Sequence, residues 1–121
     1  DCVGISFAFR NITYKNPLTS RYLSEILRVL RSGGRFVIVE SSQPRWKVIR
    51  FSFHLYLRWF VYPVGYLMSS ENGAYRYLAA SAANYYSADQ LASLLKESGF
   101  DDVGCRPLLF GAAGVFVAKK R

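Results

Sequence analysis

The order of apolar segments in the first forty residues is the feature that most constrains the fold. Residues 2–9, CVGISFAF, form a short apolar run that is typical of a buried strand. Apolar residues then recur at helical spacing from 23 to 30, and a Gly-Gly pair at 33–34 ends that helix. Residues 35–40, RFVIVE, form a second apolar strand. This βαβ order predicts an α/β fold whose parallel strands are buried on both faces.

Polar residues follow both predicted strands. Arg10 and Asn11 come after the first strand, and Glu40 ends the second. Ligands of open α/β sheets bind beyond the carboxyl ends of the strands, so we expect these side chains at a ligand pocket. The alternative for Arg10 is a structural ion pair with Glu40. We expect the segment from Asn11 to Pro17 to be turn-like.

The segment 44–70 mixes cationic and aromatic residues and contains no uncharged run long enough to span a bilayer. It predicts a helical insertion, with either one face packed on the core or one face at a membrane surface. The net charge of +8 favours an anionic partner. Because the basic residues are dispersed and form no recognition motif, we do not expect a nucleic acid.

The last third of the chain predicts a further helix and two strands. Ser87 and Gln90 have the spacing of a capping box, leucines at helical spacing follow, and Gly99 ends the helix. The runs DDVGCRPLLF and AAGVFVAKK predict two strands joined at Phe110-Gly111, as in a hairpin.

Neither the cysteines nor the histidine predicts a metal site. Cys2 and Cys105 lie in predicted strands without metal-type spacing, so we expect buried free thiols in a reducing compartment. His54 has no cluster of partners, and a surface or packing role is expected. The chain has no signal-peptide pattern and begins in mid-strand pattern without Met, which suggests a piece of a longer protein.

In this order, the segments resemble the C-terminal half of a class I S-adenosylmethionine-dependent methyltransferase. More narrowly, the chain resembles the ubiquinone/menaquinone biosynthesis C-methyltransferases. The matching stretches are ISFAFRNIT, EILRVLRSGGRFVIVESSQP, YPVGYLMS, AYRYLAASAANYYSADQLASLLKESGF and GAAGVFVAKK. SFxxRN and YRYLxxS are the specific motifs, whereas RVLRSGG is common to many methyltransferases.

The resemblance implies one domain over residues 1–121, the acceptor-side part of a Rossmann-like, mostly parallel sheet with an antiparallel C-terminal hairpin. Residues 44–86 would form a helical insertion that caps it. The sequence departs from the family at Ala8, at ESSQP and near Tyr86. It also lacks the glycine-rich loop and the acidic residue that hold the cofactor. We therefore expect S-adenosylmethionine to bind the full-length protein, and the isolated chain to be inactive.

The resemblance also assigns roles to individual residues. Ser6 would contact the cofactor, and Arg10 and Asn11 would be catalytic residues beside the quinol. Arg10 would stabilise a developing phenolate rather than abstract a proton, because an arginine side chain stays protonated at neutral pH. Three consecutive residues would close the acceptor pocket or pack on a helix surface: Tyr75, Arg76 and Tyr77.

The expected function is C-methylation of a quinone or quinol precursor that carries an isoprenoid tail, although sterols or phospholipid amines are acceptors on similar scaffolds. The alternative is a non-catalytic lipid- or quinone-binding module at a membrane surface. We expect a lipophilic small-molecule substrate and a cytoplasmic protein with peripheral contact to the inner face of the membrane. The unpaired first strand predicts a homodimer or a swapped assembly.

Overall fold

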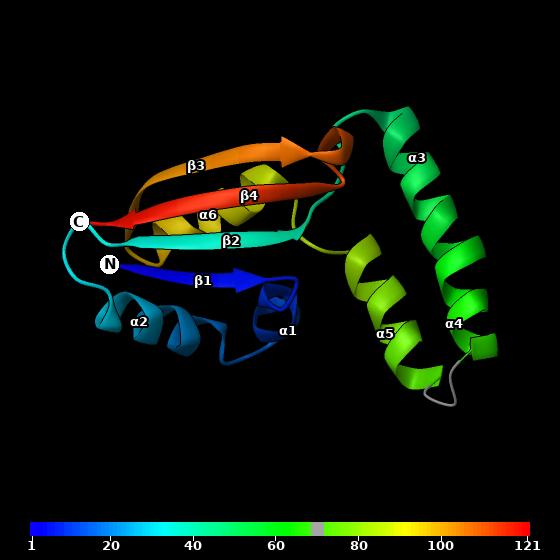
Figure 1. Cartoon of the computed structure of the whole chain (residues 1–121), viewed down its shortest axis with the longest axis horizontal. Helices are drawn as coiled ribbons and strands as arrows, with labels where there is room; N and C mark the ends of the chain where they lie inside the picture. Colours follow the sequence, from blue (N-terminus) through cyan, green and yellow to red (C-terminus); the bar gives the residue numbers. More distant parts are fainter. Residues whose placement is uncertain (69–71) are drawn as a thin grey trace.

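The computed structural model describes residues 1–68 and 72–121 and contains one four-stranded sheet (Figure 1). The strand order is β1 (Cys2–Ser6), β2 (Arg35–Ser41), β4 (Ala113–Lys120) and β3 (Phe100–Leu108). β1 and β2 are parallel, and the other two neighbouring pairs are antiparallel. The predicted α/β class with a C-terminal antiparallel hairpin is confirmed.

The connection between the two parallel strands has the predicted helix and an additional one. Helix α2 (Thr19–Val29) precedes β2, and Gly33 has the positive φ of 76° that the turn between them requires. The first strand is shorter than predicted, because β1 ends at Ser6 and Phe7 adopts a φ of 51°. The expected turn-like segment begins instead with the short helix α1 (Phe9–Thr13).

The core lies on one face of the sheet. Figure 1 shows α6 (Ala88–Glu97) behind the strands, where it packs with α1 and α2. The Phe36 ring contacts Phe9 and Phe100, with centroid distances of 5.6 and 5.7 Å. The fully buried core side chains include Phe9, Leu23, Phe36, Ile38, Leu95, Phe116 and Ala118.

The opposite face of the sheet is less protected. Val37 and Val39 of β2 and Val117 of β4 are only half-buried there. The expectation of a first strand buried on both faces is wrong for β1, in which Cys2, Gly4 and Ser6 are exposed. The reason is that β1 is an edge strand whose alternate residues face away from the core helices.

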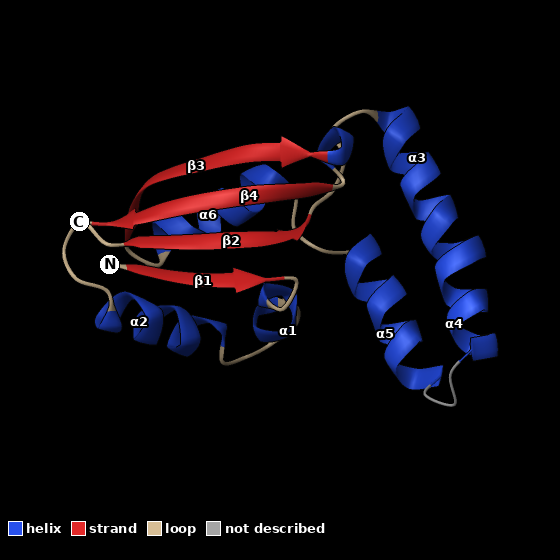
Figure 2. Cartoon of the chain, in the orientation of Figure 1, coloured by secondary structure: helices blue, strands red, loops and turns tan. Residues whose placement is uncertain are grey.

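The aromatic-rich insertion is helical and lies beside the end of the sheet (Figure 2). It comprises α3 (Lys47–Tyr56), a π-helical turn (Leu57–Val61), α4 (Tyr62–Met68) and α5 (Asn72–Ala83). The predicted insertion at 44–86 also includes residues 69–71, which lie outside the described part. Of the helices in the described residues, none has the length and apolar character needed to cross a membrane.

Other local predictions are confirmed, and one is wrong. The Ser87 and Gln90 side chains form both hydrogen bonds of the capping box. A short 3₁₀ turn, Leu109–Gly111, joins β3 to β4. Cys2 and Cys105 are free thiols as predicted, but both are exposed rather than buried, because β1 and β3 are the two edges of the sheet.

Candidate active site

A buried carboxylate lies at the carboxyl end of the parallel strands. Glu40, at the end of β2, has no solvent exposure. Its Oε2 accepts a hydrogen bond from the Arg10 backbone N–H at 3.0 Å. Its Oε1 accepts from the backbone N–H and the hydroxyl of Ser41, at 2.9 and 3.0 Å. Three donors therefore stabilise a carboxylate that solvent cannot reach.

The Arg10 side chain turns inward toward this carboxylate. Arg10 is 7 % exposed, and its Nη1 lies 3.7 Å from Glu40 Oε1 and donates to Ser41 Oγ at 2.8 Å. The structure thus contains the ion pair that the sequence raised as the alternative for Arg10. The Nε of this guanidinium is buried and has no hydrogen-bond partner among residues 1–68 and 72–121.

The other two residues predicted near the reaction are exposed. Asn11 lies on α1, where its backbone carbonyl accepts a hydrogen bond from Asn16 Nδ2 at 3.5 Å. Ser6 ends β1 and is in register with Val39, on the sheet face opposite to Glu40. The structure therefore brings Arg10 and Glu40 together, and within the described residues it has no hydrogen bond between this pair and the Ser6 side chain.

A tyrosine buried beside α1 extends the polar cluster. The Tyr85 and Thr13 hydroxyls are 2.7 Å apart, and Thr13 also donates to the Phe9 carbonyl at 2.9 Å. Burial raises the pKa of Tyr85 well above its ordinary value, an effect that the Thr13 hydrogen bond partly offsets. Sequence reasoning missed this contact because 72 residues separate its partners and neither lies in a motif.

One amide side chain connects the insertion to the end of β2. Gln43 Nε2 donates to the backbone carbonyls of Ala82 and Ala83, both at 2.8 Å. Its Oε1 lies 2.8 Å from Nε2 of His54 on α3. The packing role expected for His54 is thus observed, and Gln43 is a positioning residue that the sequence did not reveal.

The Tyr-Arg-Tyr triplet on α5 does not converge on Arg10. Tyr75 packs on Gly65 of α4 so closely that a Cβ there would overlap the ring. Arg76 contacts the Tyr62 hydroxyl at 3.5 Å. Tyr77 alone approaches α1, with its ring edge-on to Tyr14 at a centroid distance of 6.1 Å. A role for the triplet at the acceptor stays a prediction.

No group of three or more potential metal-binding side chains occurs in the described part of the chain. The glycines also do not form a cofactor loop. Gly33 and Gly34 lie between α2 and β2, and Gly111 and Gly114 lie in the β3–β4 hairpin. A loop that cradles a nucleotide follows a strand and opens a helix, and these positions do neither.

Comparison with known proteins gives a family match over nearly the whole chain. The model of the ubiE/COQ5 methyltransferase family matches residues 1–120. The chain is 39% identical over 120 residues to a demethylmenaquinone methyltransferase of Thermotoga maritima, covering 97% of the chain and 49% of that relative. It is 38% identical over 122 residues to a ubiquinone/menaquinone biosynthesis C-methyltransferase of Geobacter sulfurreducens, covering 99% of the chain and 45% of that relative. The chain spans about half the length of the curated relatives it matches.

Proposed function

Because the chain belongs to the ubiE/COQ5 methyltransferase family, we propose that it is the acceptor-side half of an S-adenosylmethionine-dependent C-methyltransferase. The acceptor is a quinone or quinol precursor with an isoprenoid tail, in line with the names of the relatives. The structural observation that supports this proposal is the buried Arg10 guanidinium at the carboxyl end of the β1–β2 pair.

Arg10 acts as a fixed cation at the acceptor. Glu40 and Ser41 hold its Nη1, so the guanidinium needs no rearrangement when charge develops nearby. The unpartnered Nε–H is buried in this structure, so it reaches a ring oxygen of the acceptor only when the residues that cover it move apart. A hydrogen bond formed there would stabilise the phenolate character of the acceptor. Arginine stays protonated at neutral pH, so removal of the ring proton falls to another group or to water.

Among residues 1–68 and 72–121, no glycine-rich loop follows a strand and opens a helix, as a site for the methyl donor in this fold requires. The exposed Ser6, at the edge of the sheet, is the residue we assign to the donor side. The remaining contacts to the donor would come from a segment that corresponds to the other half of the relatives. The isolated chain is accordingly expected to be inactive.

Titration calorimetry with S-adenosylhomocysteine tests this assignment. We expect the full-length gene product to bind it and the 121-residue chain to bind it weakly or not at all. In the full-length protein, Arg10→Gln should lower kcat for methylation of the quinol by about 100-fold, as expected for one lost oxyanion donor. The absence of binding by both proteins would contradict the enzyme assignment.

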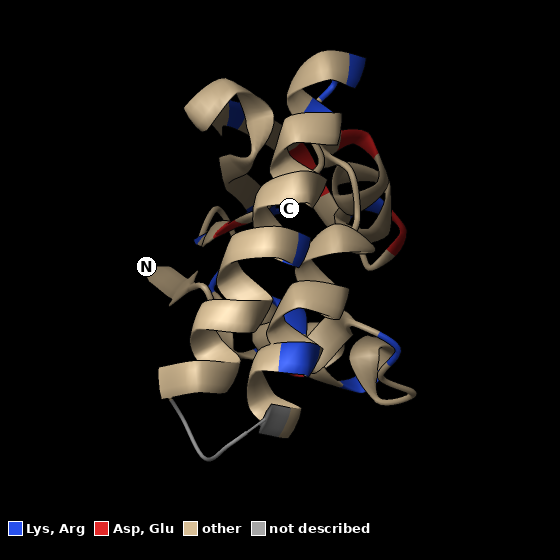
Figure 3. Cartoon of the chain, turned by 90° about the vertical axis from the view of Figure 1, so that its right-hand side faces the viewer, with Lys and Arg blue, Asp and Glu red and all other residues tan. Residues whose placement is uncertain are grey.

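A second candidate function is that of a lipid- or quinone-binding module at a membrane surface. Val48, Phe51, Leu55 and Trp59 recur at helical spacing along the insertion, and all are exposed. Four cations and no acidic residue occur from 45 to 68. Figure 3 shows Lys and Arg segments on the helices that face the viewer. An apolar stripe with cations beside it suits an anionic lipid surface.

Vesicle flotation tests this second candidate. The chain should float with vesicles that contain phosphatidylglycerol, and less with phosphatidylcholine alone. Trp59→Ser and Phe51→Ser should reduce the floated fraction, whereas Val29→Ser, which changes an exposed apolar residue on α2, should not. Equal flotation of all three variants would count against the insertion as the contact surface.

A further inference from the structure

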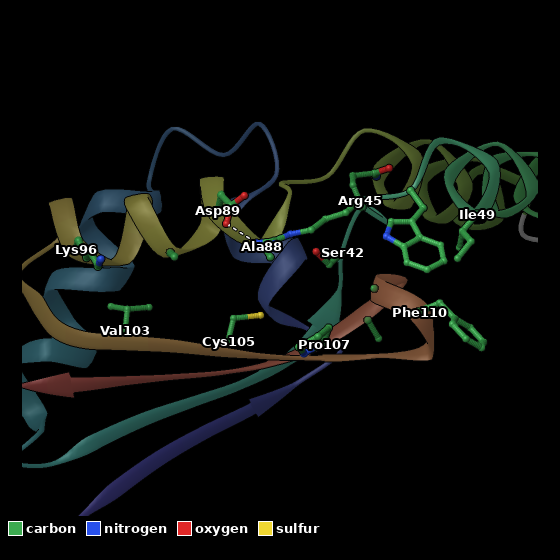
Figure 4. Close-up of a pocket in the computed structure, with 16 residues that line it drawn as sticks. Ser42, Arg45, Ile49, Ala88, Asp89, Lys96, Val103, Cys105, Pro107 and Phe110 are labelled. Atoms are coloured by element: carbon green, nitrogen blue, oxygen red, sulfur yellow. Dashed lines mark hydrogen bonds and ion pairs between the residues drawn. The ribbon is translucent and has the colours of Figure 1, made fainter.

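A cavity of about 620 Å³ lies between α6 and the β3–β4 hairpin, apart from the Arg10–Glu40 pair. Figure 4 shows Ala88, Asp89 and Lys96 of α6 on one side, and Val103, Cys105 and Pro107 of β3 on the other. The volume falls in the range of small-molecule sites, about 300–1,000 Å³.

The walls of this cavity are mainly apolar. Ala88 and Ala92 lie one turn apart on α6, so that small side chains face the strands and leave space along the helix. Trp46 and Phe110 line one end and are 73% and 84% exposed. The Arg45–Asp89 ion pair, at 3.0 Å, links the segment before α3 to the start of α6 (Figure 4). This combination suits an elongated apolar ligand better than a charged one.

One polar group in the wall lacks a partner. Ser42 is 4% exposed, and its Oγ makes no hydrogen bond with any of the residues described. Buried hydroxyls without a partner are rare, because each loses its bonds to water without replacement. Ser42 directly follows Ser41, which accepts a hydrogen bond from Arg10. A polar atom bound at Ser42 therefore lies next to the cluster assigned to the acceptor ring.

We propose that this cavity holds the isoprenoid chain of the acceptor. The isoprenoid chain lies between α6 and β3, and an oxygen of the acceptor forms a hydrogen bond with Ser42. This inference rests on the proposed function for the identity of the ligand. The binding of an isoprenoid chain, however, can be measured without methyl transfer.

Trp46 provides a fluorescence reporter within the cavity wall. The sequence has two tryptophans, so Trp59→Phe leaves Trp46 as the single emitter. Titration with farnesol, a fifteen-carbon isoprenoid alcohol, should change the Trp46 emission saturably. Prenol, with one isoprene unit, should bind at least about tenfold more weakly, because it buries far less apolar area.

Variants then locate the site. Ala92→Phe fills the cavity and should weaken farnesol binding at least about tenfold. Ser93→Phe adds the same ring at the neighbouring exposed position on α6 and should change the affinity for farnesol by less than about twofold. Ser42→Ala removes one hydrogen bond and should weaken binding by about fivefold. Unchanged affinity in both Ala92→Phe and Ser42→Ala would overturn the proposal.

Cys105 gives a second measurement that requires no cavity-filling variant. In a Cys2→Ser background it is the sole thiol, and it lines the cavity. Partial desolvation raises the pKa of this thiol, so alkylation by iodoacetamide is measured at alkaline pH, where the thiolate fraction is larger. Saturating farnesol should slow alkylation at least about fivefold, and an unchanged rate would overturn the proposal.

The outcomes separate this inference from the proposed function. Suppose that the full-length protein methylates its quinol and that Ala92→Phe leaves KM unchanged for an acceptor with an isoprenoid tail. The proposed binding site for the isoprenoid chain would then be wrong, and the proposed methyltransferase function would be supported. If farnesol binds and protects Cys105 but no methyl transfer occurs, the cavity is a chain-binding site and the enzyme assignment fails.

Discussion

Removal of the buried negative charge at Glu40 should strongly destabilise the fold. In Glu40→Gln, one carboxylate oxygen becomes an NH₂ group that faces the backbone N–H or hydroxyl donors of Arg10 and Ser41. One buried donor loses its partner, and the Arg10 guanidinium loses its counter-charge. Loss of one partner of a buried pair costs about 3–5 kcal/mol, which corresponds to a decrease of roughly 15 °C in the unfolding midpoint of a chain of this length.

Thermal unfolding followed by circular dichroism measures this effect. Glu25→Gln is the matched control, since Glu25 pairs with Arg28 on the exposed surface of α2 and its replacement should leave the midpoint unchanged. The double variant Arg10→Met with Glu40→Leu removes both charges and should be more stable than Glu40→Leu alone, and the single variant Arg10→Met completes the double-mutant cycle. A midpoint shift below about 4 °C in Glu40→Gln, or simple additivity in the cycle, would refute the coupling inferred from the structure.

Three further predictions concern the helix cap, the buried tyrosine and the sheet edge. Ser87→Ala removes the capping-box acceptor at the start of α6 and should cost about 1 kcal/mol in urea unfolding, whereas Ser93→Ala on the same helix should have a smaller effect. Because the pKa of Tyr85 is raised in the folded state, the unfolded chain releases that proton first, and stability should fall as pH rises above about 10. Tyr85→Phe should flatten this decline, and an identical slope would contradict the burial argument. The unpaired β1 edge should give a dimer in light scattering, and a monodisperse monomer of 13.8 kDa would count against it.

Local patterns in the sequence predicted most of the fold. The apolar stripe of α2, the Gly33 turn, the capping box at Ser87 and the terminal hairpin each depend on residues close in sequence. Periodicity and turn chemistry report directly on such short-range structure. The same reasoning placed Arg10 and Glu40 at one end of the sheet, because the carboxyl ends of parallel strands meet there.

The features that the sequence did not predict depend on contacts between distant segments and on the complete sheet. The end of β1 at Ser6 depends on the burial of Phe9 against the sheet, which the apolar run alone does not reveal. The exposure of the two thiols depends on which strands are edges, a property of the complete sheet. The Thr13–Tyr85 contact and the free hydroxyl of Ser42 arise only when distant segments pack together.

The way in which Gln43 holds the insertion has a mechanical consequence. The Gln43 amide contacts the end of α5 and His54 of α3. Gln43 lies just after β2, where the insertion begins, and α5 is the helix with which the insertion ends. Gln43 thereby couples the positions of α3 and α5, because a shift of either helix changes a hydrogen bond of the same side chain.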